Sequence, residues 1–207
     1  MLNTQIQQAI HLLRKGELIV FPTDTVYGLG ADASNEQAVL QVFAVKKRHY
    51  SCPLIVHIPN LDHLECWVDL ESLDEKFFKL AKNFWPGALT IVVKKSKTVS
   101  NLITSGQDSI GLRIPNHPVA LELLRGFNSG IVGTSANISG DNSLVSFEQA
   151  QQTFNNKLFI LSGGRCNKGV ESTIISLVEN PVILRQGAIS SEKIFQCLLE
   201  KNTVIFK

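Results

Sequence analysis

The sequence predicts an α/β protein with a twisted, mixed β-sheet, and two observations support this fold class. Short apolar runs typical of strands alternate with amphipathic stretches typical of helices, but the alternation is irregular and two strands follow one another late in the chain. The 207 residues are 44% hydrophobic, which is enough to bury a sizeable core. This length suits one domain over residues 1–207 better than two.

Helices are expected where apolar residues recur every three or four positions behind a capping residue. Ile6, Ile10 and Leu13 have this spacing, and Gly16 ends that helix. Capping boxes that begin at Ser34 and Ser72 start the second and third helices. The predicted helices are residues 1–16, 34–48, 72–84, 117–124, 146 onward and 191–200.

Strands are expected where short apolar runs lie between polar or turn-forming residues. The predicted strands are residues 18–21, 53–58, 89–93, 110–114, 130–133, 158–161, 173–178 and 182–184, followed by a short tail that includes residues 204–206. The polar segment 94–108 is expected to be a surface loop or lid.

The segment from Phe21 to Gly30 joins the first predicted strand to the second helix. Loops of this kind often carry binding sites in α/β proteins. Gly28 and Gly30 are expected either to allow positive φ, so that the chain turns away from an occupied cavity, or to let a ligand approach the backbone closely. An ordinary connection, with its threonines and aspartate capping local turns, is equally compatible with these residues alone.

Composition excludes several classes of protein. The net charge is only +2, which does not indicate a nucleic-acid-binding protein. A local basic patch is still compatible with this charge. The four cysteines form no C-x-x-C pair and the histidines lack metal-ligand spacing, so no metal site is predicted. The first helix lacks the apolar core of a signal peptide, and no run approaches the ~20 apolar residues of a membrane span. We therefore expect a cytoplasmic protein with reduced cysteines and no membrane contact.

Arg113 is an arginine inside an apolar predicted strand, within Gly111-Leu112-Arg113-Ile114-Pro115. Burying an unpaired guanidinium is expensive, so this side chain must reach an anion or a cavity. A bound anionic ligand and a structural ion pair satisfy that requirement equally well.

Other polar stretches lie at the ends of predicted strands and helices. They are Lys46-Lys47-Arg48, residues 134–140, residues 162–165, Glu171-Ser172-Thr173 and Arg185-Gln186-Gly187. Cations, hydroxyls and small residues of this kind suit phosphate or carboxylate binding. Solvated helix ends and ordinary turns account for each stretch taken singly. The residues alone therefore indicate an α/β domain whose loops bind an anionic ligand, without naming a reaction.

The combination of motifs is more specific than its parts. In chain order it consists of Pro22-Thr23-Asp24-Thr25-Val26-Tyr27-Gly28-Leu29-Gly30, Lys46-Lys47-Arg48, Pro53-Leu54-Ile55-Val56-His57, Trp85-Pro86-Gly87, Gly111-Leu112-Arg113-Ile114-Pro115, Ser135-Ala136-Asn137, Glu171-Ser172-Thr173 and Arg185-Gln186-Gly187-Ala188-Ile189. Over roughly residues 5–190 this set closely resembles the YrdC/TsaC family of threonylcarbamoyl-AMP synthases, whose hallmark is the K-x-R and S-x-N pair.

The resemblance implies a twisted mixed sheet flanked by helices around a large concave, positively lined cavity. It implies a nucleotidyltransferase that joins L-threonine, bicarbonate and ATP, with Mg²⁺, into L-threonylcarbamoyladenylate and releases pyrophosphate. The product would supply the t6A modification of tRNA through separate threonylcarbamoyl-transfer proteins. No covalent enzyme intermediate is required, because positioning and charge neutralisation would supply most of the catalysis.

The resemblance also assigns roles by motif match. Lys46 and Arg48 would hold phosphates as the catalytic cations. The other ATP contacts would be Ser109, Ser135, Asn137, Ser143 and Arg185, and the threonine contacts would be Thr25, His57, Arg113 and Thr173. Arg113 would then bind the carboxylate of threonine.

Three positions depart from the family pattern. His49 stands where proline is common, Cys52 where a polar residue is common, and Gln186 replaces a proline. The chain also ends soon after the last motif, as in the form without the extra C-terminal domain of Sua-type members. Two alternatives stay open: a YciO-type paralogue with divergent activity, and a YrdC-like module that binds tRNA or another RNA through its basic concave surface.

Overall fold

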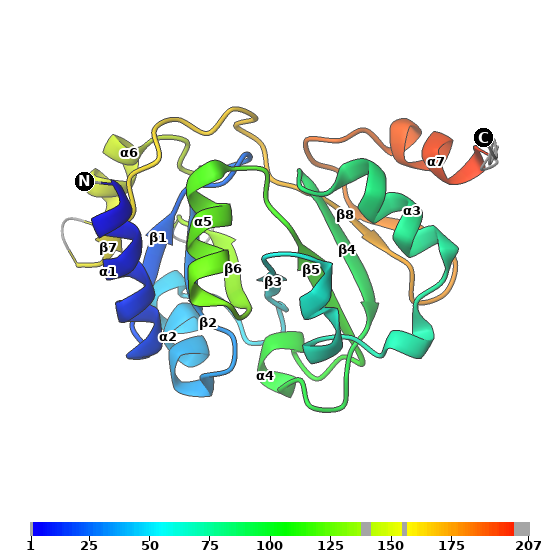
Figure 1. Ribbon diagram of the computed structural model, residues 1–207, viewed down its shortest axis with the longest axis horizontal. Coiled ribbons are helices and arrows are strands. Elements are labelled where there is room, and N and C mark those ends of the chain that lie inside the picture. Colours follow the sequence, from blue (N-terminus) through cyan, green and yellow to red (C-terminus); the bar gives the residue numbers. More distant parts are fainter. Residues whose placement is uncertain (1, 138–141, 155–156, 201–207) are drawn as a thin grey trace.

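The computed structural model describes residues 2–137, 142–154 and 157–200. Nine strands of this part of the chain form one sheet in the order β7-β1-β2-β6-β3-β5-β4-β8-β9 (Figure 1). They are β1 (Ile19–Phe21), β2 (Gly28–Asp32), β3 (Ile55–His57), β4 (Leu89–Lys94), β5 (Ser109–Arg113), β6 (Ile131–Ser135), β7 (Phe159–Ile160), β8 (Thr173–Ser176) and β9 (Val182–Arg185). Parallel and antiparallel pairs both occur, which confirms the predicted mixed sheet.

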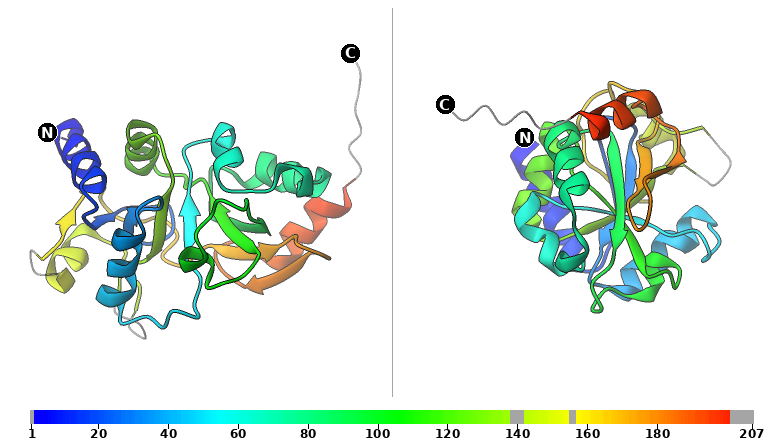
Figure 2. Two further views of the ribbon diagram at one scale, coloured as in Figure 1. Left: turned by 90° about the horizontal axis from the view of Figure 1, so that it is seen from below. Right: turned by 90° about the vertical axis from the view of Figure 1, so that its right-hand side faces the viewer.

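Helices flank both faces of the sheet. They are α1 (Leu2–Arg14), α2 (Glu36–Lys46), α3 (Glu75–Phe84), α4 (Asn101–Thr104), α5 (Pro118–Phe127), α6 (Phe147–Phe154) and α7 (Ser191–Leu199), with the short 3-10 helices η1 (Leu61–Cys66) and η2 (Leu70–Ser72). α1 packs beside α5 on one face, whereas α2 and α4 lie on the other (Figure 2). Further along the sheet, α3 packs against α7.

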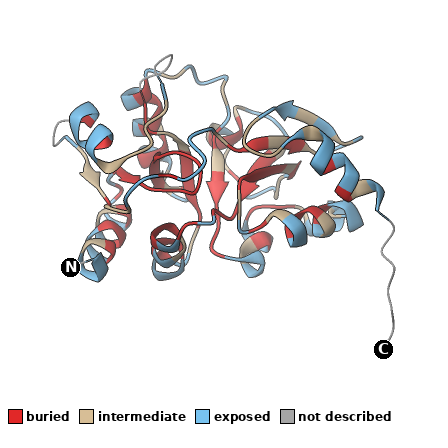
Figure 3. Cartoon of the chain, turned by 90° about the horizontal axis from the view of Figure 1, so that it is seen from above, coloured by how far each residue is buried: buried red, intermediate tan, exposed pale blue. Residues whose placement is uncertain are grey.

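The core consists of two apolar clusters. The smaller cluster joins α1 and α5 to the sheet through Ile6, Leu13, Phe21 and Leu123. Successive strand residues point to opposite faces, so Val20, next to Phe21, belongs to the larger cluster on the other side. Figure 3 shows buried residues concentrated on the strands and exposed residues on the outer surfaces of the helices.

The segment after β1 corrects one expectation from the sequence. Gly28 and Gly30 lie in strand β2, which pairs antiparallel with β1 and places Phe21 opposite Gly28. A Cβ atom at Gly30 would lie 2.7 Å from the Phe21 ring. The glycines therefore make room for an aromatic ring, and the expectation that they turn the chain is wrong.

The helix starts also differ in detail from the capping boxes. Asn35, not Ser34, caps α2, because its side-chain oxygen accepts from the Ala38 N–H while its backbone is extended. Asp74 has the same role at α3. The predicted loop at 94–108 contains the short helix α4, and the predicted tail at 204–206 lies outside the described residues.

Within the described ranges, no helix has the length and apolar character needed to cross a membrane. The four cysteines are free thiols, and Cys166 and Cys197 are buried.

Candidate active site

A cavity lies over one face of the sheet, where β2, β6, β3 and β5 are neighbours. The strand register forms its floor, because His57 pairs with Arg113 and Gly28 pairs with Ser135. The cavity encloses about 650 Å³ of empty space, part of it open to solvent.

Residues predicted for two different ligands meet in this cavity. Thr25, His57 and Arg113 from the predicted threonine set line it, and so do Arg48, Ser135 and Arg185 from the predicted ATP set. These side chains are spread along the sequence from position 25 to position 185, and the sheet brings them together.

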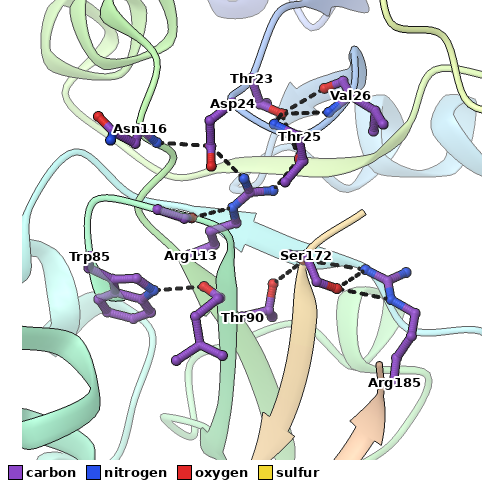
Figure 4. A network of polar contacts seen from close by, with 12 residues as sticks. Thr23, Asp24, Thr25, Val26, Trp85, Thr90, Arg113, Asn116, Ser172 and Arg185 are labelled. Carbon is purple, nitrogen blue, oxygen red and sulfur yellow. Dashed lines mark hydrogen bonds and ion pairs between the residues drawn. The ribbon is translucent and has the colours of Figure 1, made fainter. Parts of the chain in front are cut away.

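Arg113 is buried at the end of β5, and three acceptors hold its guanidinium (Figure 4). Nη2 donates to Asp24 Oδ1 at 2.6 Å, Nη1 to Thr25 Oγ1 at 2.9 Å and Nε to the Gly87 carbonyl at 2.9 Å. Burial lowers the pKa of Arg113, and the adjacent Asp24 carboxylate opposes that shift. Of the two alternatives for Arg113, the structural ion pair is therefore present. Arg113 also lines the cavity, so contact with an anionic ligand is compatible with this ion pair.

His57 lies next to Arg113 and is almost fully buried. Its ring meets the Phe21 ring edge-on, with 5.5 Å between centroids. Burial, reinforced by the positive charge of Arg113, lowers the pKa of His57 to about 3. His57 Nδ1 has no hydrogen-bond partner among the described residues, and the neutral ring lines the cavity.

The low pKa of His57 predicts how stability depends on pH. In the unfolded chain the imidazole takes up a proton near pH 6.5, whereas folded His57 stays neutral down to about pH 3. The contribution of His57 to the free energy of unfolding is therefore constant above this window and falls as the pH drops through it, by roughly 1.4 kcal/mol for each pH unit. Burial also lowers the pKa of His117, which adds a contribution of the same sign. Urea denaturation at pH 7.5 and 5.5 measures the loss, and an unchanged slope in His57→Asn would contradict this assignment.

Lys46 at the end of α2 is buried and contacts the end of β6. Its ammonium donates to the Ser135 carbonyl at 2.6 Å and to Asn137 Oδ1 at 2.8 Å. Ser135 Oγ also donates to Asn137 Oδ1, at 2.5 Å. Both halves of the K-x-R and S-x-N pair are thus in contact, although Lys46 and Asn137 are not among the residues that line the cavity.

Two further arginines, Arg48 and Arg185, line the cavity. Arg48 donates to the carbonyls of Cys52 and Pro53, at 3.2 and 3.1 Å. Cys52 therefore takes part in the site through its backbone carbonyl, which accepts from Arg48. Arg185 donates to the Ser172 carbonyl at 2.9 Å, and Ser172 Oγ is 2.8 Å from Thr90 Oγ1 (Figure 4).

Glu171 is the one carboxylate among the described residues that line this cavity. Ser143 donates to it, which connects a predicted ATP contact to the cavity indirectly. Burial raises the pKa of Glu171, but the Ser143 hydrogen bond, its own backbone and the charges of Arg185 and Lys46 together lower it below its usual value. The carboxylate is therefore ionised in a cationic surrounding.

The structure does not bring Ser109 and Thr173 to the cavity surface. Ser109 begins β5, four residues before Arg113, or roughly 13 Å along the strand. Thr173 lies between Ser172 and Ile174, which line the cavity, so its side chain points to the other face. Its hydroxyl accepts from the Gly187 and Ile189 N–H groups at 3.0 Å and thereby supports the turn after β9.

The site also contains residues for which the sequence analysis predicted no role. Asp24 pairs with Arg113, and Thr23 Oγ1 bonds to the Val26 carbonyl at 2.6 Å and closes the turn before β2. Asp24 and Thr23 lie inside the motif Pro22–Gly30, but the motif alone does not indicate which residues they contact. Gly133 lies in an apolar strand, where a glycine often marks a close approach of another group.

The structure is an α/β domain with a mixed sheet, and its cavity is lined by arginines, hydroxyls and a neutral histidine, a set of groups suited to anionic small molecules. A family model described as "Telomere recombination", for the Sua5/YciO/YrdC family, matches residues 11–187. The chain belongs to this family, which confirms the resemblance seen in the motifs.

Three similar proteins illustrate the relationship. The threonylcarbamoyl-AMP synthase of Pyrococcus abyssi is 43% identical over 192 residues, which cover 92% of this chain and 56% of the relative. The threonylcarbamoyl-AMP synthase of Aliivibrio fischeri is 31% identical over 182 residues, which cover 88% of this chain and 98% of the relative. The solved structure of P. abyssi Sua5 complexed with L-threonine has a TM-score of 0.90 and 42% identity, and the match covers 94% of this chain and 57% of that one. The chain thus spans about half the length of the Pyrococcus protein.

Proposed function

We propose that this protein synthesises L-threonylcarbamoyladenylate from L-threonine, bicarbonate and ATP, with release of pyrophosphate. It would act as a nucleotidyltransferase in the cytoplasm. The observation that carries the proposal is that one cavity is lined both by Thr25, His57 and Arg113 and by Arg48, Ser135 and Arg185. The names of the Pyrococcus and Aliivibrio relatives and the threonine complex of Sua5 support it.

The chemistry requires two bonds to form in one place. The neutral amine of threonine attacks bicarbonate, with loss of water, or CO₂, with loss of a proton, to give an N-carboxylate. An oxygen of that carboxylate then attacks the α-phosphate of ATP as pyrophosphate leaves. Threonine would lie beside Arg113, with its carboxylate on the guanidinium. The phosphates would lie nearer Arg48 and Ser135, with Lys46 behind them, and Arg185 would contact the adenylate. Each substrate carries negative charge, so the cationic lining favours binding of all three together.

Mg²⁺ would enter with ATP and neutralise charge on the leaving pyrophosphate. Protein sites commonly hold this ion through one or two carboxylates together with substrate phosphates. The Glu171 carboxylate fits that requirement as a single ligand. No group of three or more acidic, cysteine or histidine side chains that could hold a metal by itself gathers in the described ranges.

The adenylate would be passed to threonylcarbamoyl-transfer proteins that modify tRNA. Under this proposal the chain supplies an activated intermediate, and direct contact with tRNA is not needed for its reaction.

The test is incubation of the protein with ATP, L-threonine, bicarbonate and Mg²⁺. We expect pyrophosphate release that depends on both threonine and bicarbonate, together with an adenylate that carries carbon from labelled bicarbonate. Pyrophosphate release at the same rate without threonine would contradict the proposal. Tight ATP binding without any product would favour the divergent paralogue, and salt-dependent RNA binding without ATP affinity would favour the RNA-binding module.

A further inference from the structure

Asp24 is buried beside the cavity but does not line it. Its carboxylate oxygen Oδ1 accepts from Arg113 Nη2 at 2.6 Å and from the Asn116 backbone N–H at 2.9 Å. One side chain thus connects the segment after β1 to the segment after β5 and to the arginine at the end of β5 (Figure 4).

The contacts of Arg113 leave part of its donor set for a ligand. A guanidinium has five N–H groups in a rigid, planar fork. The contact with Asp24 uses one N–H of Nη2, and the contact with Thr25 uses one N–H of Nη1. The contact with Gly87 uses the single N–H of Nε. One N–H therefore remains on each terminal nitrogen, and a charged N–H of this kind forms a strong hydrogen bond with a carboxylate.

We propose that Asp24 is a positioning residue for amino-acid binding, which fixes the plane of Arg113 so that its two remaining terminal N–H groups face the carboxylate of the substrate. This inference rests on the proposed function and adds a residue that never touches threonine itself. An aspartate is suited to this role because it holds the arginine in one orientation and compensates its buried charge. Its effect is confined to the amino-acid side of the cavity, because Arg48, Ser135 and Lys46 have their own partners.

The first experiment compares Asp24→Asn with the wild-type protein by isothermal titration calorimetry. Asparagine keeps the size and one acceptor oxygen but removes the charge. We expect the dissociation constant for L-threonine to rise roughly ten- to a hundredfold, since this is the usual effect of losing a charge-assisted hydrogen bond. The dissociation constant for a non-hydrolysable ATP analogue should change less than about twofold. Asp62→Asn, which removes an exposed carboxylate on η1, is the matched control and should leave both affinities unchanged.

Two further measurements separate positioning from a merely structural role. Because Asp24 acts through Arg113, adding Asp24→Asn to Arg113→Gln should cause no further loss of threonine affinity. Binding of L-threoninol, which lacks the carboxylate, should be the same in Asp24→Asn and in the wild type. Asp24→Glu keeps the charge one methylene further out, and it should retain the fold while weakening threonine binding.

The outcomes distinguish the inference from the proposed function. A wild-type protein that binds neither ATP nor threonine would overturn both. If the wild type binds both ligands, then a folded Asp24→Asn or Asp24→Glu with normal threonine affinity would overturn the inference alone. Equal loss of ATP and threonine affinity would also overturn it, since that result would show a general structural role.

Discussion

Replacing Lys46 with methionine is expected to weaken ATP binding by roughly ten- to a hundredfold and to lower the free energy of unfolding by about 1–3 kcal/mol. Methionine has an unbranched chain of similar length but supplies no donor and no charge. The Ser135 carbonyl and Asn137 Oδ1, at 2.6 and 2.8 Å from the ammonium, would each lose a donor. The end of β6 would then no longer be fixed beside the cavity, and the phosphates would lose the nearby positive charge.

Lys47→Met is the matched control for this prediction. Lys47 is exposed and ends α2 in the left-handed conformation, with φ of 50°. Methionine has the same backbone constraint as lysine there, so both ATP affinity and stability should stay within about 0.5 kcal/mol of the wild type. Calorimetry with an ATP analogue and urea denaturation measure the two quantities. Wild-type ATP affinity in Lys46→Met would show that the buried ammonium does not support the phosphate site.

The sequence predicted the sheet where apolar runs are continuous, but it did not predict β2. The residues of β2 are Gly28-Leu29-Gly30-Ala31-Asp32, which lack both a continuous apolar run and alternation of large apolar residues. Their strand conformation depends on pairing with β1 on one side and β6 on the other. Such pairing is tertiary, and no local pattern reports it.

The site shows the same division between local and tertiary information. The apolar residues around Arg113 predicted that its guanidinium must contact an anion. That the anion is Asp24 did not follow, because the two residues are 89 positions apart and meet only through the order of the strands. Thr173 illustrates the limit of motifs: alternation along β8 directs its hydroxyl to the turn after β9, while Ser172 lines the cavity.

Gly133→Ala is expected to destabilise the protein by about 1–3 kcal/mol and to remove most of its threonine affinity. A Cβ atom at this position would lie 2.4 Å from His57 Cε1 and 2.5 Å from His57 Nδ1. The ring cannot easily move away, because it is buried and packs edge-on against Phe21. Both Gly133 and His57 line the cavity, so any displacement of the ring changes the space beside Arg113. Thermal denaturation and calorimetry with L-threonine measure the two effects.

A second substitution tests whether the clash is the cause. His57→Ala removes the ring that the new methyl group would meet, so the double variant should be less destabilised than the sum of the two single variants. Stability would then be partly recovered while threonine affinity stays low, because the missing imidazole cannot be replaced by a methyl group. Additive losses in stability would instead show that Gly133 is required for a reason other than the approach of His57. The same cycle separates the role of His57 in packing from its role in ligand binding. Removing the ring relieves the clash with the new methyl group, but it does not restore threonine binding.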